Sequence, residues 1–418
     1  MKTKKIVVAI LLTALLTSCK EESAVIKFEQ TDTFKTLSEV KLPKPNQDEL
    51  TLDSEFVDST LEVLEKMTKM YYEDTNLENY VVSPMSLYYA LSMINNGTSN
   101  ANENEISKFL SINNMNKAND NLKKHYQNNY YKTKSAYEKV SNSLWINNNY
   151  EVKEMFVNIL EDNFYSDFYS VDFSDNQTIE NIAKWVNFNT ENFLNKTSED
   201  YKYLNDINTN MTLINTIYFN CSWEYEAVKN TIKEEFKGLN NAIITDFFYK
   251  SAKGTFLQKD QYLIFNDTFV NGSKVYYILP NENVNLKDLL NNENIYNEIF
   301  DFIKSPTVEK SIIYKAPEFD ILYNVKFIEI LEKMGCLIND IEFENIIENK
   351  NLKISNIIQD NRIVFSKNGV EVASETQVDS LTSSHVKIEL NTIINRPFMF
   401  IITDSQNTPL FTGSLFDL

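Results

Sequence analysis

Histidine and cysteine, which often perform acid–base and nucleophilic chemistry, are scarce in this 418-residue chain. It contains two histidines, His125 and His385, and three cysteines, Cys19, Cys221 and Cys336. Cys221 ends an apolar run, TIYFNC, and no evident base in the sequence would activate its thiol as a nucleophile. Two histidines without cysteine pairs at ligand spacing do not make a zinc site, and no glycine-rich phosphate loop is present. The sequence therefore predicts no catalytic site, no metal and no cofactor.

Cys19 differs from the other cysteines because its surroundings indicate covalent modification. Residues 1–18 begin with a lysine-rich stretch and continue with an apolar run that is too short to span a bilayer. The run ends in Leu-Thr-Ser directly before Cys19, an order that resembles the lipobox of bacterial lipoproteins. The alternative is an ordinary secretory signal followed by an unrelated cysteine. We expect cleavage before Cys19 and lipidation of its sulfur.

That modification would place the protein in a bacterial cell envelope, lipid-anchored to the outer membrane. Lys-Glu-Glu follows Cys19 at once and resembles the short acidic signals that export some lipoproteins to the cell surface. Cys221 and Cys336 both lie in apolar contexts, which favours buried free thiols. An oxidising compartment would also permit a disulfide between them, since pairing cannot be deduced from sequence.

The composition limits the function classes. The chain has 40 basic and 59 acidic residues, a formal charge of -19, which repels phosphates and argues against nucleic-acid binding. Hydrophobic residues make up 43%, enough for a large core. Residues 19–49 are polar and unperiodic, and we expect a flexible tether there. Residues 50–418 contain no further linker or repeat, so we expect one domain. We also expect the protein to be a monomer.

A segment after Gly369 has the pattern of a strand that can be buried inside a sheet. It has no proline before Pro397, so every backbone N–H is free to pair. Alternate residues are uncharged and small or β-branched: Val370, Val372, Ser374, Thr376, Val378, Ser380 and Thr382. The other face comprises Glu371, Ala373, Glu375, Gln377, Asp379, Leu381 and Ser383, and every charged residue of the segment lies on it. We expect the first face to enter a core and the second to meet solvent, because strand side chains alternate.

The elements around this segment predict an α+β domain. Apolar residues at three- and four-residue steps predict a helix over residues 53–72, and Ser83-Pro84 opens another. Further helices are expected at 178–194 and 326–334. Apolar, β-branched runs predict strands at 211–220, 274–279, 311–314, 362–365 and 398–403. Helices come first and strands later, which favours α+β over alternating βαβ units.

Five segments, in order, resemble the serpin family of protease inhibitors. They are NYVVSPMSLYYALSMINNG, TLINTIYFNCSWEYEA, KVYYILPNENVNLKDLL, APEFDILYNVKFIEILEKMG and RPFMFIITDSQNTPLFTG. The resemblance covers about residues 50–418. It implies helices packed around a large mixed central β-sheet, with smaller sheets and an exposed reactive loop at about residues 369–390. It also implies suicide inhibition, in which a target protease attacks the loop, an acyl-enzyme forms, and the cut loop inserts into the sheet.

The resemblance assigns roles to residues of this chain. The loop hinge comprises Gly369, Val370, Glu371, Val372, Ala373, Ser374, Glu375 and Thr376. The region where the sheet opens comprises Ser83, Ser86, Asn215, Trp223 and Gln359. Three places depart from the family pattern: Lys367 stands where glutamate is usual, Gln359 where histidine is usual, and VEVASETQ replaces an alanine-rich run. The third departure does not disable insertion if Glu375 lies on the solvent face.

The reactive bond is less sharply defined. Family spacing from Gly369 places the specificity residue near Ser383, and spacing back from Pro397 places it near Val386. The candidates are Leu381, Thr382, Ser383, Ser384, His385 and Val386. Small and apolar residues suit elastase-like or subtilisin-like serine proteases, or papain-like cysteine proteases. The alternative function is a non-inhibitory surface lipoprotein of serpin fold that binds a host protein or glycan.

Overall fold

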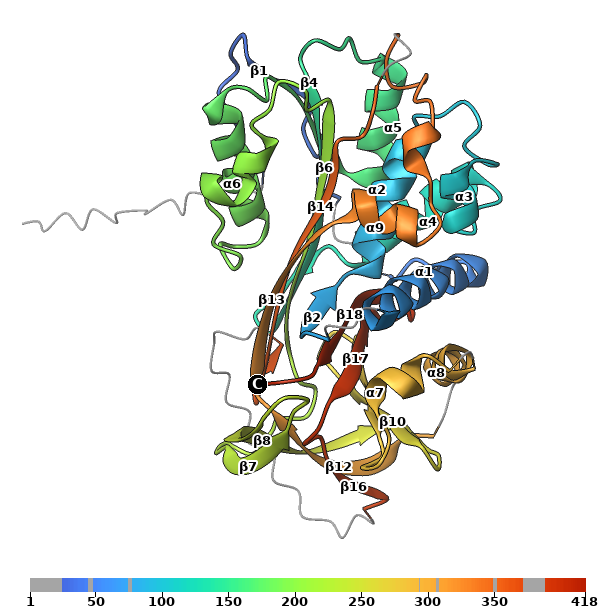
Figure 1. The fold of residues 1–418 in the computed structure, drawn as a ribbon, viewed down its shortest axis with the longest axis vertical. Coiled ribbons are helices and arrows are strands. Elements are labelled where there is room, and N and C mark those ends of the chain that lie inside the picture. Colours follow the sequence, from blue (N-terminus) through green and yellow to red (C-terminus); the bar gives the residue numbers. More distant parts are fainter. Residues whose placement is uncertain are drawn as a thin grey trace, which may run out of the picture.

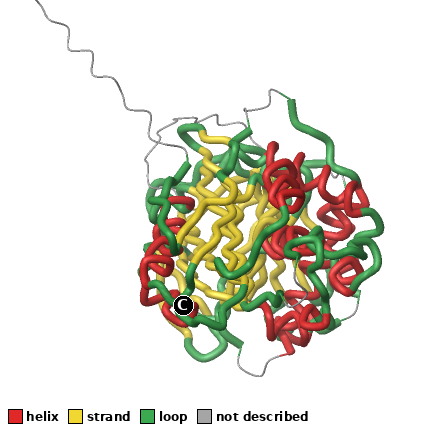
Figure 2. The backbone as a smooth tube through the Cα atoms, turned by 90° about the horizontal axis from the view of Figure 1, so that it is seen from above, coloured by secondary structure: helices red, strands yellow, loops and turns green. Residues whose placement is uncertain are grey.

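The structure, a computed structural model, describes residues 25–43, 48–73, 77–292, 294–305, 308–348, 352–370 and 388–418. Strands form the centre of the molecule, and helices pack around them (Figure 2). The helices are α1 (Ser54–Glu73), α2 (Pro84–Asn95), α3 (Glu105–Phe109), α4 (Met115–Asn128), α5 (Glu154–Phe164), α6 (Asn176–Asn189), α7 (Leu286–Leu290), α8 (Ile295–Lys304) and α9 (Phe327–Lys333), with 3-10 turns η1 (Ser198–Leu204) and η2 (Ile338–Asp340).

The largest sheet is mixed and has the strand order β1-β5-β4-β6-β15-β14-β13, with β3 paired on β4. Its strands are β1 (Phe34–Ser38), β3 (Tyr131–Lys132), β4 (Ala136–Asn147), β5 (Ser166–Val171), β6 (Met211–Ser222), β13 (Phe319–Lys326), β14 (Asn356–Ser366) and β15 (Gly369–Val370). α6 lies against one face, while α2, α4, α5 and α9 lie on the other (Figure 1). This is the large mixed central sheet that the resemblance implies.

Two smaller sheets complete the fold. One has the order β2-β18-β17-β11-β10-β9 and comprises β2 (Tyr80–Val82), β9 (Phe256–Gln258), β10 (Tyr262–Thr268), β11 (Lys274–Pro280), β17 (Phe398–Thr403) and β18 (Pro409–Leu415). The other has the order β16-β12-β8-β7 and comprises β7 (Ile232–Lys237), β8 (Ala242–Gly254), β12 (Lys310–Pro317) and β16 (Leu390–Ile393). No helix in the described ranges has the length and apolar character needed to cross a bilayer.

The strongest sequence patterns form the expected elements. Val57, Leu61, Leu64 and Met67 lie buried along one face of α1. α2 begins at Pro84 because the Ser83 hydroxyl accepts a bond from the backbone N–H of Ser86 at 3.1 Å, which caps the helix. β6 is buried along most of its length, as the continuous apolar run predicted.

Two expectations are corrected. The helix expected over 178–194 ends at Asn189, because Glu191, Asn192 and Asn195 adopt positive φ, which breaks the helix. The tether expected over 19–49 is in part folded, since residues 34–38 form β1, which pairs antiparallel with β5. Apolar residues there bury themselves against the large sheet, which a freely moving tether cannot do.

Cys221 and Cys336 are free, buried thiols, so the disulfide alternative is not found in the structure. Burial raises the pKa of each thiol to about 12, which keeps both protonated at neutral pH. A protonated, buried thiol is a poor nucleophile, in line with the absence of a catalytic motif around Cys221.

Candidate functional site: a seam in the large sheet

The two strands at the centre of the large sheet, β6 and β14, contact each other directly over only part of their length. Residues 356–359 of β14 pair in parallel with residues 212–215 of β6. At the other end, β15 lies between them: Val370 pairs with Phe365 of β14 and with Cys221 of β6. We call this line between β6 and β14 the seam. It is closed at one end and holds the first residues of the hinge at the other.

Gly369 allows the chain to enter the seam. Its φ is +142°, and a Cβ atom there would lie 2.1 Å from the Cys221 carbonyl oxygen. Only glycine fits such a close approach of two backbones. Val370 follows and is 1% exposed, packed in one apolar cluster with Phe365 and Cys221. The predicted inward face of the loop therefore begins in the core, at the residue where it was expected to begin.

The pairing of β15 fixes what a longer inserted strand would meet. β15 runs antiparallel to both neighbours, so each step along the loop moves one residue back along β14 and β6. Six steps after Val370, on the same face, the neighbours are Gln359 and Asn215. The receiving positions of this face are buried or half-buried: Ile363, Asn361, Gln359, Phe219, Ile217 and Asn215.

The opposite face differs from the expectation of solvent. Five steps after Val370, the level that Glu375 would reach, the neighbours are Asp360 and Thr216, and both are buried. Asp360 forms an ion pair with Lys196 at 2.7 Å and accepts a bond from the Tyr201 hydroxyl at 2.7 Å. Residues near α6 and η1 thus cover the sheet here. An inserted Glu375 would adjoin a buried ion pair, so the expectation that it meets water is wrong at this level.

Four of the predicted sheet-opening residues meet at the closed end of the seam. Gln359 accepts a bond from the backbone N–H of Ser83 at 2.8 Å and donates to the Ser83 carbonyl at 2.8 Å. Gln359 pairs with Asn215 across the seam, and Asn215 donates to Asn142 on β4. Ser86 lies on the first turn of α2 beside its cap. These residues join β14, β6 and the start of α2, so opening the seam must disturb them.

The fifth residue, Trp223, lies at the other end of the seam beside the hinge. Its indole N–H donates to the Ser366 carbonyl at 3.0 Å, and its ring stacks on Phe269 with centroids 4.7 Å apart. The ammonium of Lys250 lies 4.1 Å from the ring centroid and pairs with Asp267 at 2.5 Å, with both side chains fully buried. Trp223 thus ties the turn before Gly369 to a buried ion pair.

Comparison with known proteins identifies the fold. The model of the family described as Serpin (serine protease inhibitor) matches residues 60–418. The chain belongs to the serpin family. A serpin-like protein of fowlpox virus is 29% identical over 352 residues, covering 79% of this chain and 94% of that protein. Neuroserpin from Homo sapiens is 23% identical over 358 residues, covering 80% and 85%.

Solved serpin structures share the architecture. The thermophilic serpin tengpin in its native state matches with a TM-score of 0.76 at 24% identity, covering 92% of this chain and 100% of that one. An Arabidopsis serpin in its native stressed conformation matches with a TM-score of 0.74 at 20% identity, covering 88% and 99%. These likenesses show the serpin fold.

Two departures from the serpin pattern have local partners in this chain. Gln359, where histidine is usual, makes the two backbone bonds to Ser83 described above. Lys367, where glutamate is usual, lies beside a carboxylate from the link between β12 and β13: its backbone N–H donates to Glu318 at 2.9 Å, and its ammonium donates to the Lys229 carbonyl at 3.0 Å. Reasoning from the sequence missed Glu318, because its contact with Lys367 joins residues 49 positions apart.

The described ends of the serpin loop are tied into two different sheets. Val370 lies in the seam of the large sheet, and β16, after the loop, pairs in parallel with β12 over residues 390–393. The hinge residues from Glu371 to Thr376 and the reactive-bond candidates from Leu381 to Val386 lie outside the described residues. Cys19 does as well.

Proposed function

We propose that this serpin is a protease inhibitor that traps its target by inserting the cut loop into the seam. The observation that carries the proposal is β15, which already holds Gly369 and Val370 between β6 and β14. The residues that follow on the same face as Val370 are uncharged, as the buried and half-buried receiving positions of that face require. Burying an unpaired charge on the inward face would cost several kcal/mol, and that face carries none.

The proposed chemistry belongs to the target protease. Its serine or cysteine nucleophile attacks a loop carbonyl between Leu381 and Val386 and gives up its proton to the protease's own base. The peptide bond breaks, the new amino terminus leaves, and an ester or thioester joins the loop to the enzyme. The freed hinge then enters the seam as a central strand and distorts the protease before water can complete hydrolysis.

The favoured targets are elastase-like and subtilisin-like serine proteases and papain-like cysteine proteases. Their specificity pockets accept the small and apolar residues that occur between Leu381 and Val386. The persistence of the uncut protein is kinetic, since insertion adds a paired strand to a sheet that is only partly closed.

Incubation with elastase, subtilisin and papain tests this function. Non-reducing denaturing gels are expected to show a covalent complex with at least one protease, and mass spectrometry of the released peptide locates the cut bond. Only cleaved chain with all three proteases would contradict inhibition by these classes. It would favour the alternative of a surface protein that binds a host protein or glycan.

We further propose that Cys19 is lipidated and anchors the inhibitor, as a monomer, to the outer membrane of a bacterial envelope. Labelled palmitate is expected to enter the wild-type protein, and Cys19→Ala is expected to lose both the label and membrane partitioning. A Cys19→Ala protein that still partitions with membranes would contradict the anchor.

A further inference from the structure

Glu138 is an anomalous side chain on β4. It is 0% exposed, and neither carboxylate oxygen has a hydrogen-bond partner among the described residues. A buried carboxylate without donors strongly disfavours its charged form. The inhibitory mechanism proposed above uses no proton on this protein, so Glu138 needs a different explanation.

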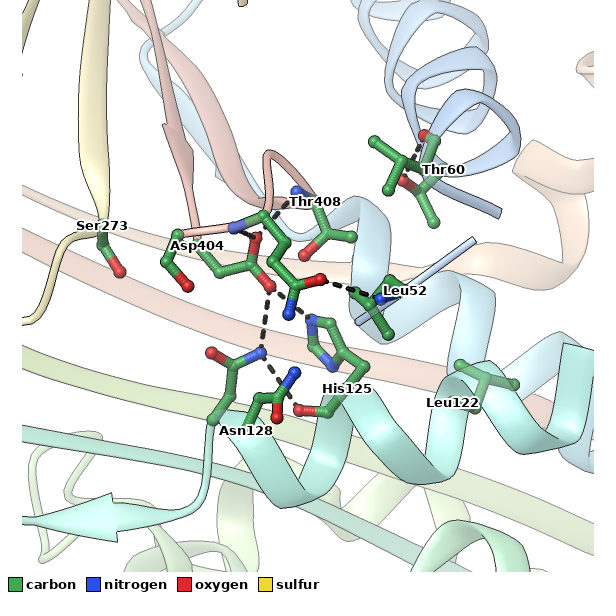
Figure 3. A network of polar contacts seen from close by, with 12 residues as sticks. Leu52, Thr60, Leu122, His125, Asn128, Ser273, Asp404 and Thr408 are labelled. Carbon is green, nitrogen blue, oxygen red and sulfur yellow. Dashed lines mark hydrogen bonds and ion pairs between the residues drawn. The ribbon is translucent and has the colours of Figure 1, made fainter. Parts of the chain in front are cut away.

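Asp404, in the turn between β17 and β18, is a charged group that acts on Glu138, and Glu138 pairs with Tyr131 of β3, two residues after Asn129. One carboxylate oxygen accepts bonds from the backbone N–H groups of Gln406 at 2.9 Å and Thr408 at 2.8 Å. The other accepts a bond from the Asn129 side chain at 3.2 Å. Figure 3 shows Asp404 between this turn and the imidazole of His125. Asp404 therefore has three hydrogen-bond donors, whereas Glu138 has none among the described residues.

His125, on α4, completes the cluster. It is 0% exposed, its Nε2 lies 3.6 Å from the Asp404 carboxylate, and its Nδ1 lies 2.9 Å from the Tyr89 hydroxyl (Figure 3). Nε2 has no hydrogen-bond partner within the described chain. The titratable groups coupled to Glu138 lie on four elements and one turn. Asp404, in the turn, acts on Glu138 directly, and His125 on α4 is coupled to it through Asp404. Glu138 in turn acts on Tyr89 of α2, Tyr131 of β3 and Cys221 of β6.

We propose that Glu138, Asp404 and His125 form a proton-operated latch that holds β4 against α4 and the β17–β18 turn. With Glu138 protonated, the cluster has one negative charge, on Asp404, and β4 packs closely. When Glu138 loses its proton, a second negative charge lies buried beside Asp404. Repulsion and desolvation then favour movement of β4 away from the turn.

The latch is connected to the seam by hydrogen-bonded strands. β4 pairs with β6 from Ala136 to Ile146, and β6 is one wall of the seam. Movement of β4 would therefore also move β6, the strand that must separate from β14 when the seam opens. This link to the seam rests on the proposed function, whereas the effect of the latch on stability does not.

The sign of the pH dependence follows from the shifted groups. Burial, with a smaller contribution from Asp404, raises the pKa of Glu138 well above its ordinary value of 4.5. The contribution of Glu138 to stability is therefore greatest below pH 4.5 and declines as pH rises toward the folded-state pKa. Burial lowers the pKa of His125 below 6.5, so its contribution is lost only as pH falls below that value. Lys139, on the opposite face of β4, has its pKa lowered by burial to about 8 and is protonated below that pH.

Unfolding rates at a fixed urea concentration, measured at pH 7.0 and 8.0, test the latch. The wild-type rate is expected to rise about threefold to tenfold over this interval. Glu138→Gln, which keeps the shape but cannot ionise, is expected to unfold more slowly than wild type at pH 8.0 and to lose most of this dependence. The difference between the two proteins removes contributions from other groups. Equal pH dependence in both, or faster unfolding of E138Q at pH 8.0, would overturn the latch.

Asp167→Asn is the matched control, because Asp167 is also a buried carboxylate of the same sheet. Unlike Glu138, it accepts bonds from the Trp185 indole at 2.8 Å and the Val40 backbone at 3.0 Å. An amide has one acceptor oxygen in place of two, so D167N is expected to unfold faster than wild type at both pH values. If both amide variants shift stability in the same direction, the special status of Glu138 is refuted.

Two further measurements separate the latch from folding of the variant and from the proposed function. Infrared spectra of the wild type at pH 7.0 are expected to show the carbonyl band of a buried protonated carboxyl, and absence of that band overturns the proposal. A synthetic peptide of residues 370–382 is expected to anneal into the wild-type protein faster at pH 8.0 than at pH 7.0. If it never anneals while the unfolding rates behave as expected, seam insertion fails and the latch stands.

Discussion

The large sheet contains two short strands that differ in completeness, β1 at its edge and β15 at its centre. We call β1 the edge addition and β15 the central addition. β1 covers the edge strand β5 with residues 34–38 and buries Phe34, which lies 5.4 Å from Tyr169 and 6.1 Å from Trp145 between ring centroids. β15 occupies the centre with two residues, Gly369 and Val370. The edge addition is therefore a complete short strand, whereas the central addition consists of only the first two residues of a possible longer strand.

This difference shows where the large sheet can still accept a further strand. Between the closed end and β15, no strand pairing among the described residues joins 216–220 of β6 to 360–364 of β14. An entering strand would add backbone bonds on both sides, each worth about 0.5–1.5 kcal/mol net. The edge offers no such gain on the β5 side, because β1 already occupies it. We expect variants in the seam to change both trapping and stability, and variants at the edge to change stability alone.

The largest effect is expected from Thr376→Arg. By the register of β15, residue 376 reaches the level of Gln359 and Asn215, both buried. Placing a guanidinium there without a partner would cost several kcal/mol and stop insertion. Denaturing gels with a protease that complexes the wild type are expected to show at least about 100-fold less complex and mostly cleaved chain. Glu371→Arg is the control, since residue 371 would lie between the half-buried Val364 and Asn220. Unchanged trapping by T376R would refute the assigned face.

A large effect on stability alone is expected from Phe34→Ala at the edge. Phe34 is 3% exposed within an aromatic cluster, and removing such a side chain typically costs about 3 kcal/mol. Urea unfolding is expected to show this loss, while the number of inhibitor molecules consumed per trapped protease stays as in the wild type. Lys35→Ala, at an exposed position of the same strand, should change neither. A change in the trapping ratio of F34A would mean that the edge and the seam are coupled.

An intermediate effect is expected from Gln359→Ala at the closed end. The change leaves the backbone N–H and carbonyl of Ser83 without their partner, at a cost of about 2 kcal/mol. Because those bonds hold β14 to the start of α2, the variant is expected both to unfold more readily and to insert the loop without cleavage. Incubation at 37 °C followed by native gels and a trapping assay measures the inactive, inserted fraction. If Q359A loses stability but does not inactivate faster than the wild type, Gln359 does not restrain the seam.

Alternation in the sequence marked the residues after Gly369 as able to form a central strand, whereas no pattern marked the edge addition, and the reason is periodicity. The loop after Gly369 alternates strictly, so an inward face could be assigned from the sequence, and Val370, the first residue of that face, is buried. β1 does not alternate, because its register with β5 shifts between Thr36 and Ser38. A β-bulge of this kind puts consecutive polar and apolar residues out of phase. Residues 34–38 therefore looked like part of a polar tether.

Contacts between distant segments were the other limit of sequence reasoning. Ser83, Asn215 and Gln359 were assigned to one region by family resemblance, and the structure joins them by hydrogen bonds and strand pairing. The cover over Asp360 was not predicted, because Lys196 and Tyr201 come from a stretch with no strand or loop pattern of its own. The solvent face assigned to Glu375 was wrong at that level for this reason. Alternation says which residues share a face, but not what else packs on it.

The smallest effect is expected from Glu318→Ala, which acts on the turn that starts the central addition. Glu318 accepts the backbone N–H of Lys367, two residues before Gly369, and its loss should cost about 1 kcal/mol at this partly exposed site. That corresponds to about fivefold faster hydrogen exchange at the Val370 amide, because β15 would leave the seam more often. Glu309→Ala, an exposed glutamate of the neighbouring segment, should leave this exchange unchanged. Trapping by E318A should also consume more inhibitor molecules per protease, since insertion would start from outside the sheet. If hydrogen exchange becomes faster but the number of inhibitor molecules consumed per protease stays the same, the two residues of β15 do not help the loop to insert.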